Sequence, residues 1–218
     1  MRLIEKEYCY LIEDFFHPQI VAGFTKPILT GRLPADIMTA LSFLNQKPDV
    51  AYLNQVHGAQ THLIESSGVY TGDGLFTKKN NLALIVRSAD CMPIFFSSQN
   101  CVGMVHMGWR SAKEGVLNNT PGDLSKFKVA VGAGMRRCCY QVGCEFFDYP
   151  QFTEHISQKD DKAIFNPVSF IKDNLYPNGL SDNRFFDLKV CSKCSDKGLF
   201  SFRRNQTSSR ILSFILRL

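Results

Sequence analysis

The chain has 218 residues, of which 44% are hydrophobic and 21% charged, and it contains eight cysteines but only five histidines. A chain of this length can bury roughly 70% of the surface that its unfolded form exposes, which argues against a small disulfide-stapled scaffold and predicts one domain over residues 1–218. The net charge of +5 is mild and the basic residues are scattered, which argues against a nucleic-acid partner and suits a small anionic substrate.

The first residues show no secretory signal, because charge returns at Glu5 before any apolar core region. Apolar runs such as Leu82–Val86 and Ile211–Leu216 have the length of strands and fall short of the roughly 18 residues that span a membrane. We therefore predict a cytoplasmic protein without a membrane partner, whose thiols are reduced.

The first predicted helix covers Ala35–Leu44, where apolar residues recur at helical spacing. The glycines of Gly72–Gly74 predict a turn. Unbroken apolar runs predict three strands covered on both faces: Leu82–Val86, Val102–Met107 and Lys128–Gly132. A helix over Ser111–Asn119 fits between the last two of these strands.

Two further elements are predicted in the last third of the chain. A helix is expected over Glu145–Ser157, although Pro150 within this range disfavours a continuous helix. Strands are expected at Phe200–Phe202 and Ile211–Leu216, joined by a polar turn. Because strands and helices are mixed throughout, the sequence predicts an α/β or α+β domain.

Reactive side chains gather in three segments beside turns or strand ends. They are Asn54-Gln55-Val56-His57-Gly58, Ser88-Ala89-Asp90-Cys91-Met92-Pro93 and His106-Met107-Gly108-Trp109-Arg110. One histidine or cysteine in each segment could bind a metal ion: His57, Cys91 and His106. Their spacing matches no local zinc motif, because structural zinc sites bring ligands in closely spaced pairs.

If the fold brings His57, Cys91 and His106 together, two imidazoles and one thiolate leave a fourth position of a tetrahedral zinc ion open, as in catalytic sites. Each residue taken alone has an ordinary structural interpretation. A histidine at a strand end is commonly a hydrogen-bonded structural residue, and a cysteine after a buried strand commonly packs as a small hydrophobe.

A second cysteine pair, Cys191-Ser192-Lys193-Cys194, has the spacing of half a zinc knuckle or of a redox dithiol. Its missing half could be Cys138-Cys139, but adjacent cysteines have poor geometry for binding one ion. We therefore expect these residues to be reduced thiols in turns.

Several activities are excluded by their missing motifs. No histidine is followed two residues later by glutamate, and Val190 rather than proline precedes Cys191, so the usual zinc nucleobase deaminase signature is absent. The Walker pattern, the dinucleotide fingerprint and the G-x-S-x-G elbow are absent as well.

Three further stretches accompany the reactive segments: Gly72-Asp73-Gly74-Leu75-Phe76-Thr77, Cys138-Cys139-Tyr140-Gln141-Val142-Gly143 and Phe200-Ser201-Phe202-Arg203-Arg204. Together the six stretches resemble the laccase-domain family, also called the YfiH-type or multicopper polyphenol oxidoreductase family. Bacterial and animal members of that family are assigned as purine nucleoside phosphorylases with adenosine deaminase activity.

The resemblance implies an α/β (α+β) fold, a sandwich of mixed β-sheet flanked by helices and related to a group of cysteine hydrolases. It implies that His57, Cys91 and His106 bind Zn²⁺. The implied substrates are phosphate and a purine nucleoside, such as adenosine, inosine or methylthioadenosine, which would yield the free base and ribose 1-phosphate. Adenosine deamination would be a side activity, and the chain would act as a monomer or a homodimer.

Phosphorolysis needs a phosphate placed beneath the anomeric carbon and relief of the charge that builds on the departing base. Arg110, next to the implied metal site in sequence, could supply positioning and electrostatic stabilisation. Asp73 or Asp90 could hydrogen-bond the purine or donate a proton if burial raises its pKa.

Asn54, Gln55 and Asp90 are the substrate-binding candidates within the matching stretches, and Lys26 is a fourth. Lys26 lies near the position where the family carries an arginine, so it would offer phosphate a point charge without a bidentate fork. Ser195 replaces the histidine that often follows the late cysteine pair.

Three alternative functions stay open at this point. A copper-dependent polyphenol oxidase is disfavoured because five histidines without an H-x-H pair cannot supply a multicopper centre, although a Cys/His site can bind a single Cu²⁺. A metal-free cysteine hydrolase would use Cys91 as nucleophile and His106 or His57 as base. An interaction protein would hold a closed structural zinc ion.

Overall fold

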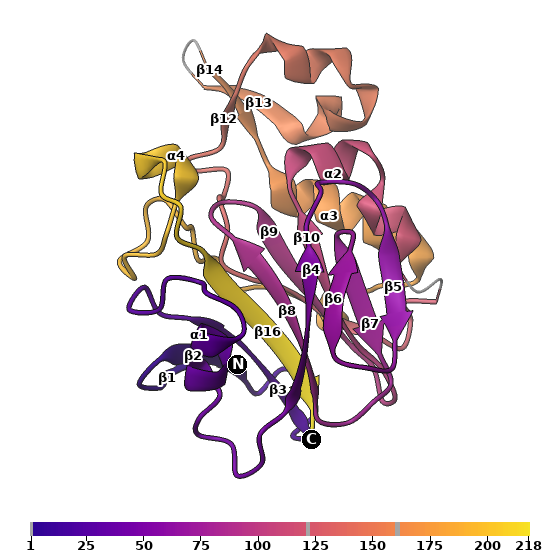
Figure 1. Ribbon diagram of the computed structural model, residues 1–218. Coiled ribbons are helices and arrows are strands. Elements are labelled where there is room, and N and C mark those ends of the chain that lie inside the picture. Colours follow the sequence, from indigo (N-terminus) through magenta and orange to yellow (C-terminus); the bar gives the residue numbers. More distant parts are fainter. Residues whose placement is uncertain (1, 121–122, 160–161) are drawn as a thin grey trace.

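The computed structural model describes residues 2–120, 123–159 and 162–218 (Figure 1). Its first sheet has seven strands, in the spatial order β1 (Arg2–Glu5), β2 (Cys9–Glu13), β3 (Ile20–Thr25), β16 (Ile211–Arg217), β8 (Leu82–Ser88), β4 (Asp49–Asn54) and β6 (Gly68–Thr71). Its second sheet has six strands, in the order β15 (Phe185–Asp187), β11 (Lys128–Val131), β9 (Met92–Ser97), β10 (Val102–Met107), β7 (Gly74–Thr77) and β5 (Thr61–Ile64). A third sheet has three strands, in the order β12 (Gln141–Val142), β14 (Lys162–Phe165) and β13 (Ile156–Lys159).

The helices are short. The α-helices are α1 (Ala35–Ala40), α2 (Trp109–Lys113), α3 (Pro167–Leu175) and α4 (Phe202–Asn205). Short 3₁₀ helices complete the connections: η1 (Val116–Asn119), η2 (Cys144–Asp148), η3 (Pro150–His155), η4 (Tyr176–Asn178) and η5 (Asp182–Arg184). Among the described residues, no helix is long and apolar enough to cross a membrane.

Both large sheets combine parallel and antiparallel pairs. In the first sheet β4 runs parallel to β6 and β8, whereas β8, β16, β3, β2 and β1 are successively antiparallel. In the second sheet β5–β7 and β11–β15 are parallel and the central pairs are antiparallel. The expected α/β sandwich of mixed sheets flanked by helices is therefore confirmed.

The two large sheets pack face to face, and β8 shows why its sequence is apolar without interruption. Leu82, Leu84 and Val86 lie in the core between the sheets, whereas Ala83 and Ile85 point to the opposite face and pack beneath α1. A strand buried on both faces needs apolar residues at every position. The outer face of the second sheet is covered by α2, η1, η2, η3 and α3, so the molecule has helices on both outer faces (Figure 1).

The predicted buried strands are confirmed as β8, β10 and β11, and Ile211–Leu216 is confirmed within β16. The predicted helix at Ala35–Leu44 is confirmed but ends at Ala40. The predicted helix at Ser111–Asn119 forms as two pieces, α2 and η1, because Gly115 between them has a positive φ of 80°.

Two predictions from the last third of the chain are wrong. Glu145–Ser157 does not form one helix, because Tyr149 is extended ahead of Pro150 and separates η2 from η3. Phe200–Phe202 does not form a strand, because the Ser201 hydroxyl accepts a hydrogen bond from the Arg204 N–H and caps α4.

Candidate active site

Four strands bring the predicted reactive segments to one edge of the sandwich. The ends of β4 and β8 lie together because these strands are parallel, and β16 begins beside them, where Ile211 pairs with Ser88. In the second sheet, His106 near the end of β10 pairs with Pro93 near the start of β9. The connection Ala89–Cys91 crosses from β8 in one sheet to β9 in the other.

The loop that carries His57 is tied to the buried carboxylate of Asp73. The backbone N–H groups of Val56, His57 and Gly58 donate to Asp73 at 3.3, 3.2 and 2.7 Å. His57 itself has a positive φ of 59°, a conformation that costs energy for a residue with a side chain. The three hydrogen bonds therefore stabilise the turn that aims the imidazole.

The same carboxylate orients His106. Asp73 Oδ1 lies 2.8 Å from His106 Nδ1, and both side chains are buried. This bond leaves Nε2 of His106 free to act as a ligand or base. Burial acts to raise the pKa of Asp73, but His106 and the backbone N–H groups outweigh it and lower the pKa. The condition for proton donation by Asp73, a pKa raised by burial, is therefore not met.

Cys91 completes the group. Its Sγ lies 3.9 Å from His57 Nε2, and the rings of His57 and His106 meet edge to face at 4.9 Å between centroids. Asp90, directly before Cys91, has a φ of 108°, so the chain turns sharply at this point. Gly108 leaves room for the group, since a Cβ there would lie 2.9 Å from His57 Cδ2 and 3.0 Å from Cys91 Sγ.

The three side chains change one another's ionisation. Burial opposes ionisation of the Cys91 thiol, but the imidazoles of His106 and His57 lower its pKa to about 6. Burial also opposes the charged form of His106, and the Cys91 thiolate and the Asp73 carboxylate raise its pKa to about 9. In the absence of metal, these interactions favour a Cys91 thiolate paired with a His106 imidazolium.

His57, Cys91 and His106 can bind a metal ion, because their ligand atoms all lie within 4.8 Å of one another. Two imidazole nitrogens and one thiolate suit Zn²⁺ and also Cu²⁺. Metal-binding histidines usually donate their other ring N–H to a carboxylate or carbonyl, and the Asp73 carboxylate accepts from His106 Nδ1 in this way. Three protein ligands would leave a coordination position open, as in catalytic zinc sites.

A cavity of about 540 Å³ adjoins this group, a size typical of small-molecule sites. Its walls come from the ends of β4, β8 and β10, the start of α2, the turn after β11, and the segment around α4. The lining residues are Gln55, His57, Arg87, Ser88, Ala89, Asp90, Cys91, His106, Gly108, Trp109, Arg110, Met135, Tyr140, Phe202, Arg203, Ser208 and Arg210.

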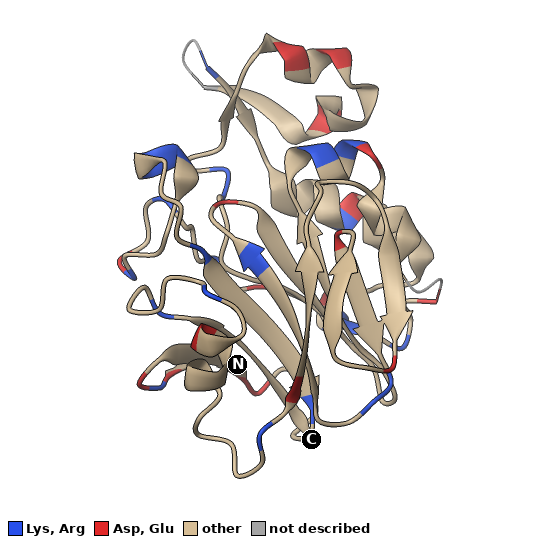
Figure 2. Cartoon of the chain, viewed as in Figure 1, with Lys and Arg blue, Asp and Glu red and all other residues tan. Residues whose placement is uncertain are grey.

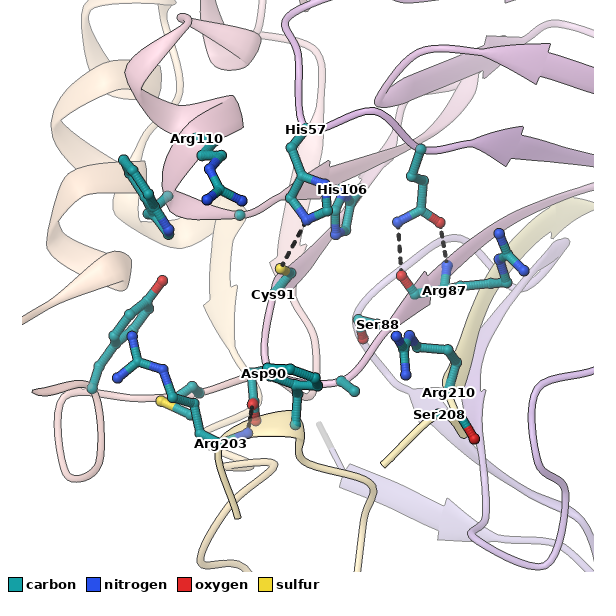
Figure 3. A pocket seen from close by; sticks show the side chains of 17 residues that line it. His57, Arg87, Ser88, Asp90, Cys91, His106, Arg110, Arg203, Ser208 and Arg210 are labelled. Atoms are coloured by element: carbon teal, nitrogen blue, oxygen red, sulfur yellow. Dashed lines mark hydrogen bonds between the residues drawn. The ribbon is translucent and has the colours of Figure 1, made fainter. Parts of the chain in front are cut away.

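Arginine and serine side chains form one side of the cavity. Figure 3 shows Arg87 and Arg210 with Ser88 and Ser208 on one side of the His57, Cys91 and His106 group. Arg87 Nε and Ser88 Oγ are buried and have no hydrogen-bond partner within the described chain. Unpartnered buried donors next to a cavity favour a bound anion.

Gln55 and a short loop fix the bases of these two arginines. The Gln55 side-chain amide donates to the Arg87 carbonyl and accepts from the Arg87 N–H, both at 2.8 Å. The Arg210 guanidinium donates to the carbonyls of Thr207 and Ser209, both at 2.9 Å. The cationic side is thus preorganised from two separate elements.

The opposite side of the cavity combines aromatic and cationic groups. The guanidinium of Arg110 lies 5.0 Å from the centroid of a Trp109 ring, and that of Arg203 lies 5.7 Å from the Tyr140 centroid. Figure 3 shows Arg110 and Arg203 across the histidine and cysteine group from Arg87. A planar, polar ligand such as a nucleobase fits such a wall, because it can stack on aromatic and guanidinium planes.

Asp90 connects the cavity to the last third of the chain. Its Oδ1 accepts a hydrogen bond from Ser192 Oγ and its Oδ2 accepts one from the Arg203 N–H, both at 2.7 Å. Each carboxylate oxygen of Asp90 accepts only one of these bonds, so each can accept another from a ligand in the cavity.

Not every predicted site residue reaches this cavity. Asp73 lies behind the two histidines, Asn54 is exposed at the end of β4, and the Lys26 ammonium pairs with Glu5 at 2.6 Å. None of the three lines the cavity, whereas Gln55, Asp90 and Arg110 do. A substrate-binding role for Asn54 or Lys26 has no support from this geometry.

Sequence reasoning missed Arg87, Arg210, Tyr140 and, as a site residue, Arg203. Two of them had a usable signal. Arg87 is the single charge at the end of an apolar strand, directly before the Ser88-Ala89-Asp90-Cys91 segment. Arg210 directly precedes the final strand, and its position gained meaning only from the pairing of β16 with β8.

Basic side chains surround the cavity more densely than the net charge of +5 indicates. Figure 2 shows Lys and Arg on α2, on α4 and at the end of β8, all of which contribute residues to the cavity walls. This distribution gives a cavity with positive potential, which attracts small anions.

The chain was compared with known proteins. The family model described as multi-copper polyphenol oxidoreductase laccase matches residues 35–218. A purine nucleoside phosphorylase of Aquifex aeolicus is 32% identical over 150 residues, which cover 66% of this chain and 70% of the relative. A purine nucleoside phosphorylase of Borreliella burgdorferi is 26% identical over 229 residues, which cover 95% of this chain and 96% of the relative.

Solved structures share the fold. The Bacillus licheniformis hypothetical protein YfiH superposes with a TM-score of 0.85 at 20% identity over 99% of both chains. YlmD from Geobacillus stearothermophilus superposes with a TM-score of 0.81 at 21% identity over 98% of this chain and 97% of the other. The chain belongs to the multi-copper polyphenol oxidoreductase laccase family.

Proposed function

We propose that this chain, as a member of that family, is a purine nucleoside phosphorylase with a single active site in the cavity at His57, Cys91 and His106. The observation that carries the proposal is the division of the cavity into an anion-binding side and an aromatic side, with the histidine and cysteine group between them. The names of the relatives from Aquifex aeolicus and Borreliella burgdorferi support the same activity.

In this reaction a phosphate oxygen attacks the anomeric carbon of the ribose. The glycosidic carbon–nitrogen bond breaks, its electron pair leaves with the purine, and the purine nitrogen takes up a proton. The products are ribose 1-phosphate and the free base. Catalysis therefore requires a phosphate held in line with the breaking bond and a polar environment for the departing base.

Arg87, Arg210 and Ser88 are the proposed phosphate-binding residues. Guanidinium groups bind phosphate oxygens through paired N–H donors, and Arg87, Arg210 and Ser88 all line the cavity. Because the carbonyls of Thr207 and Ser209 hold the Arg210 guanidinium before phosphate arrives, little entropy of that side chain is lost on binding. Gln55 fixes the backbone from which Arg87 extends.

Trp109 and Tyr140 are the proposed platform for the purine, with Arg110 and Arg203 adding charge at the edge of the ring. Asp90 is placed to accept a hydrogen bond from the purine, and its orientation is fixed by Ser192 and the Arg203 N–H. Asp73 is proposed as a positioning residue, because it acts on the site through His106 and the His57 loop.

A Zn²⁺ ion held by His57, Cys91 and His106 would supply positive charge beside the reacting atoms, and the same charge would activate water if adenosine is deaminated. The chain's own contribution is to hold these ligands. Asp73 fixes the protonated nitrogen of His106, and Gly108 leaves the space that the ligands need. Adenosine deamination is proposed as a side activity of the same cavity.

The proposal is tested by incubating the zinc-loaded protein with adenosine or inosine, with and without phosphate, and identifying products by mass spectrometry. We expect free base and ribose 1-phosphate in equal amounts only when phosphate is present, and inosine from adenosine without it. Cys91→Ala should abolish both reactions. Equal product formation by wild type and Cys91→Ala, or no product from either, would contradict the proposal.

A second candidate function has one observation in its favour. Cys91, His106 and Asp73 form the chain of contacts expected of a cysteine hydrolase, with the lowered pKa of Cys91 supplying a thiolate. This candidate predicts that hydrolysis is fastest in chelator-treated protein and is inhibited by zinc. The phosphorylase proposal predicts the opposite dependence on zinc.

A further inference from the structure

Four of the seven cysteines that the proposed reaction does not use lie together beside the turn that follows β11. Cys138 and Cys139 lie in that turn, and Cys191 and Cys194 lie in the loop between β15 and α4. They are free thiols in turns, as expected, but the expectation that Cys138 and Cys139 are poorly placed to join the Cys191–Cys194 pair is wrong. Their four Sγ atoms all lie within 4.8 Å of one another.

The distances suit one tetrahedral ion. Four thiolates about 2.3 Å from a zinc ion lie roughly 3.8 Å from one another. Here Cys138 Sγ and Cys194 Sγ are 3.5 Å apart, and all four cysteines are free thiols. The sulfur atoms of these adjacent cysteines are therefore close enough to Cys191 and Cys194 to bind one ion, contrary to the expectation from their spacing.

The backbone supports the cluster from both sides. The Ser195 N–H donates to the Cys191 carbonyl at 3.1 Å, so the chain turns at the Cys191–Cys194 pair. Backbone N–H groups of Arg136, Lys193 and Cys194 lie near the Cys191 sulfur. This arrangement resembles a knuckle, in which the chain turns around the first cysteine of a C-x₂-C pair. Gly134 and Cys191 form a β-bridge that fixes the two segments to each other.

The surroundings can balance the charge of such a site. Four thiolates around a divalent cation carry a net charge of −2, which is costly to bury without nearby cations. The guanidinium of Arg136 is buried next to Cys138 and Cys191, and pairs on its other side with Asp187 at 2.7 Å. Arg137 and Lys189 line the same surface depression.

We propose that Cys138, Cys139, Cys191 and Cys194 form a second metal site, a closed structural one that takes a soft-ligand divalent cation of the zinc class. Four sulfur ligands leave no open position, so the site has no catalytic role. It goes beyond the proposed phosphorylase activity and does not depend on it.

The site would fix two parts of the active-site cavity. Tyr140 follows Cys139 directly and lines the cavity, as does Met135 from the same turn. On the other segment, Ser192 follows Cys191 and donates to Asp90. A metal ion that joins the turn after β11 to the loop before α4 therefore holds the aromatic wall and Asp90 in one arrangement.

The test is metal stoichiometry in the full-length protein, purified with reductant and zinc and then freed of unbound metal. We expect two zinc ions per chain in wild type by elemental mass spectrometry, and one in Cys91→Ser. The double variant Cys138→Ser with Cys194→Ser changes two exposed thiols and should also retain one ion. Cys144→Ser, an exposed cysteine outside both groups, is the matched control and should retain two.

Cobalt substitution identifies which site is filled without relying on the cysteine variants. In Cys91→Ser the single Co²⁺ should show thiolate-to-cobalt absorption roughly four times as strong per ion as in the double variant, because four sulfurs replace one. Circular dichroism shows whether the double variant is folded. If the double variant is unfolded, the zinc contents of wild type and Cys91→Ser still show whether a second metal site exists.

Two results would overturn the proposal. One is a wild-type protein that binds a single ion, all of which is lost in Cys91→Ser. The other is a reduced-purified chain whose mass is lower by two hydrogen atoms and whose digest contains a Cys138–Cys194 disulfide.

Discussion

Asp73 shows how the role of a residue is decided by what it contacts. In the sequence, Asp73 is one of two carboxylates that could hydrogen-bond the purine or donate a proton to it. In the structure its side chain is fully buried, accepts three backbone N–H groups and holds His106 at 2.8 Å. The sequence identified the residue as part of the site but could not predict that it faces away from the cavity, since that depends on β7 lying beside β10.

Asp73→Asn should weaken metal binding at His57, Cys91 and His106 by about 10–100-fold. This is the usual effect of removing a carboxylate that holds a metal-binding histidine. The amide cannot offer acceptors to both His106 and the loop N–H groups. Chelator competition measures the affinity. Asp14→Asn, which removes an exposed carboxylate near Arg2, is the control, and an affinity equal to that control would contradict the assigned role.

Cys91 provides a pH test of the electrostatics. Because its pKa is lowered to about 6, its thiolate predominates above that pH and disappears as the pH falls through it. In chelator-treated protein, iodoacetamide should therefore modify Cys91 at a rate that is half-maximal near pH 6, and added zinc should protect it. Peptide mass spectrometry measures the rate, with Cys144 as an internal reference. A half-maximal rate near pH 9 would contradict the lowered pKa.

At the scale of elements, strand ends determine where the site lies, and one glycine determines whether its ligands fit. The apolar runs of β8 and β10 were predictable from sequence, and so was the gathering of reactive residues where they end. The elements missed from the sequence were those with a weaker apolar pattern. One is the meander β1–β3, whose first strand is partly exposed. Another is β9, which begins with Met92-Pro93, the end of the reactive segment Ser88–Pro93.

Gly108→Ala should disrupt metal binding without unfolding the sandwich. The added Cβ would lie 2.9 Å from His57 Cδ2 and 3.0 Å from Cys91 Sγ, so the ligands must move, at a cost of about 1–3 kcal/mol. Gly58→Ala is the matched control, because its Cβ would meet only ordinary contacts at 3.6 and 3.9 Å. Metal titration compares the two variants, and equal affinities would contradict this account.

Strand β16 offers both a test variant and a control for the proposed phosphate site, because arginines lie at both ends of this strand. Arg210 precedes β16 and lines the cavity, whereas Arg217 ends the strand and donates to the carbonyls of Gln99 and Lys78. Arg210→Lys should raise the KM for phosphate about tenfold by removing the guanidinium fork. Arg217→Lys should leave it unchanged, and steady-state kinetics with varied phosphate decides between them.

At the scale of the whole molecule, the sandwich brings five of the six matching stretches to one cavity, and the sixth, Gly72–Thr77, supports it through Asp73. Fold class and family were predictable because apolar strands and the H-x-G-W-R and A-D-C stretches are local features. The combination of residues that forms the cavity walls was not predictable. Arg87, Tyr140 and Arg210 come from three elements that meet only through sheet pairing and the crossing from β8 to β9.

The central claim is that phosphate itself attacks the ribose in this cavity. It is tested most directly with phosphate labelled with ¹⁸O at all four oxygens, incubated with the zinc-loaded protein and inosine in ordinary water. The account predicts ribose 1-phosphate that retains all of the label, together with unlabelled hypoxanthine, and neither product from Cys91→Ala. Free ribose without ribose 1-phosphate would show that water is the nucleophile and would contradict the account.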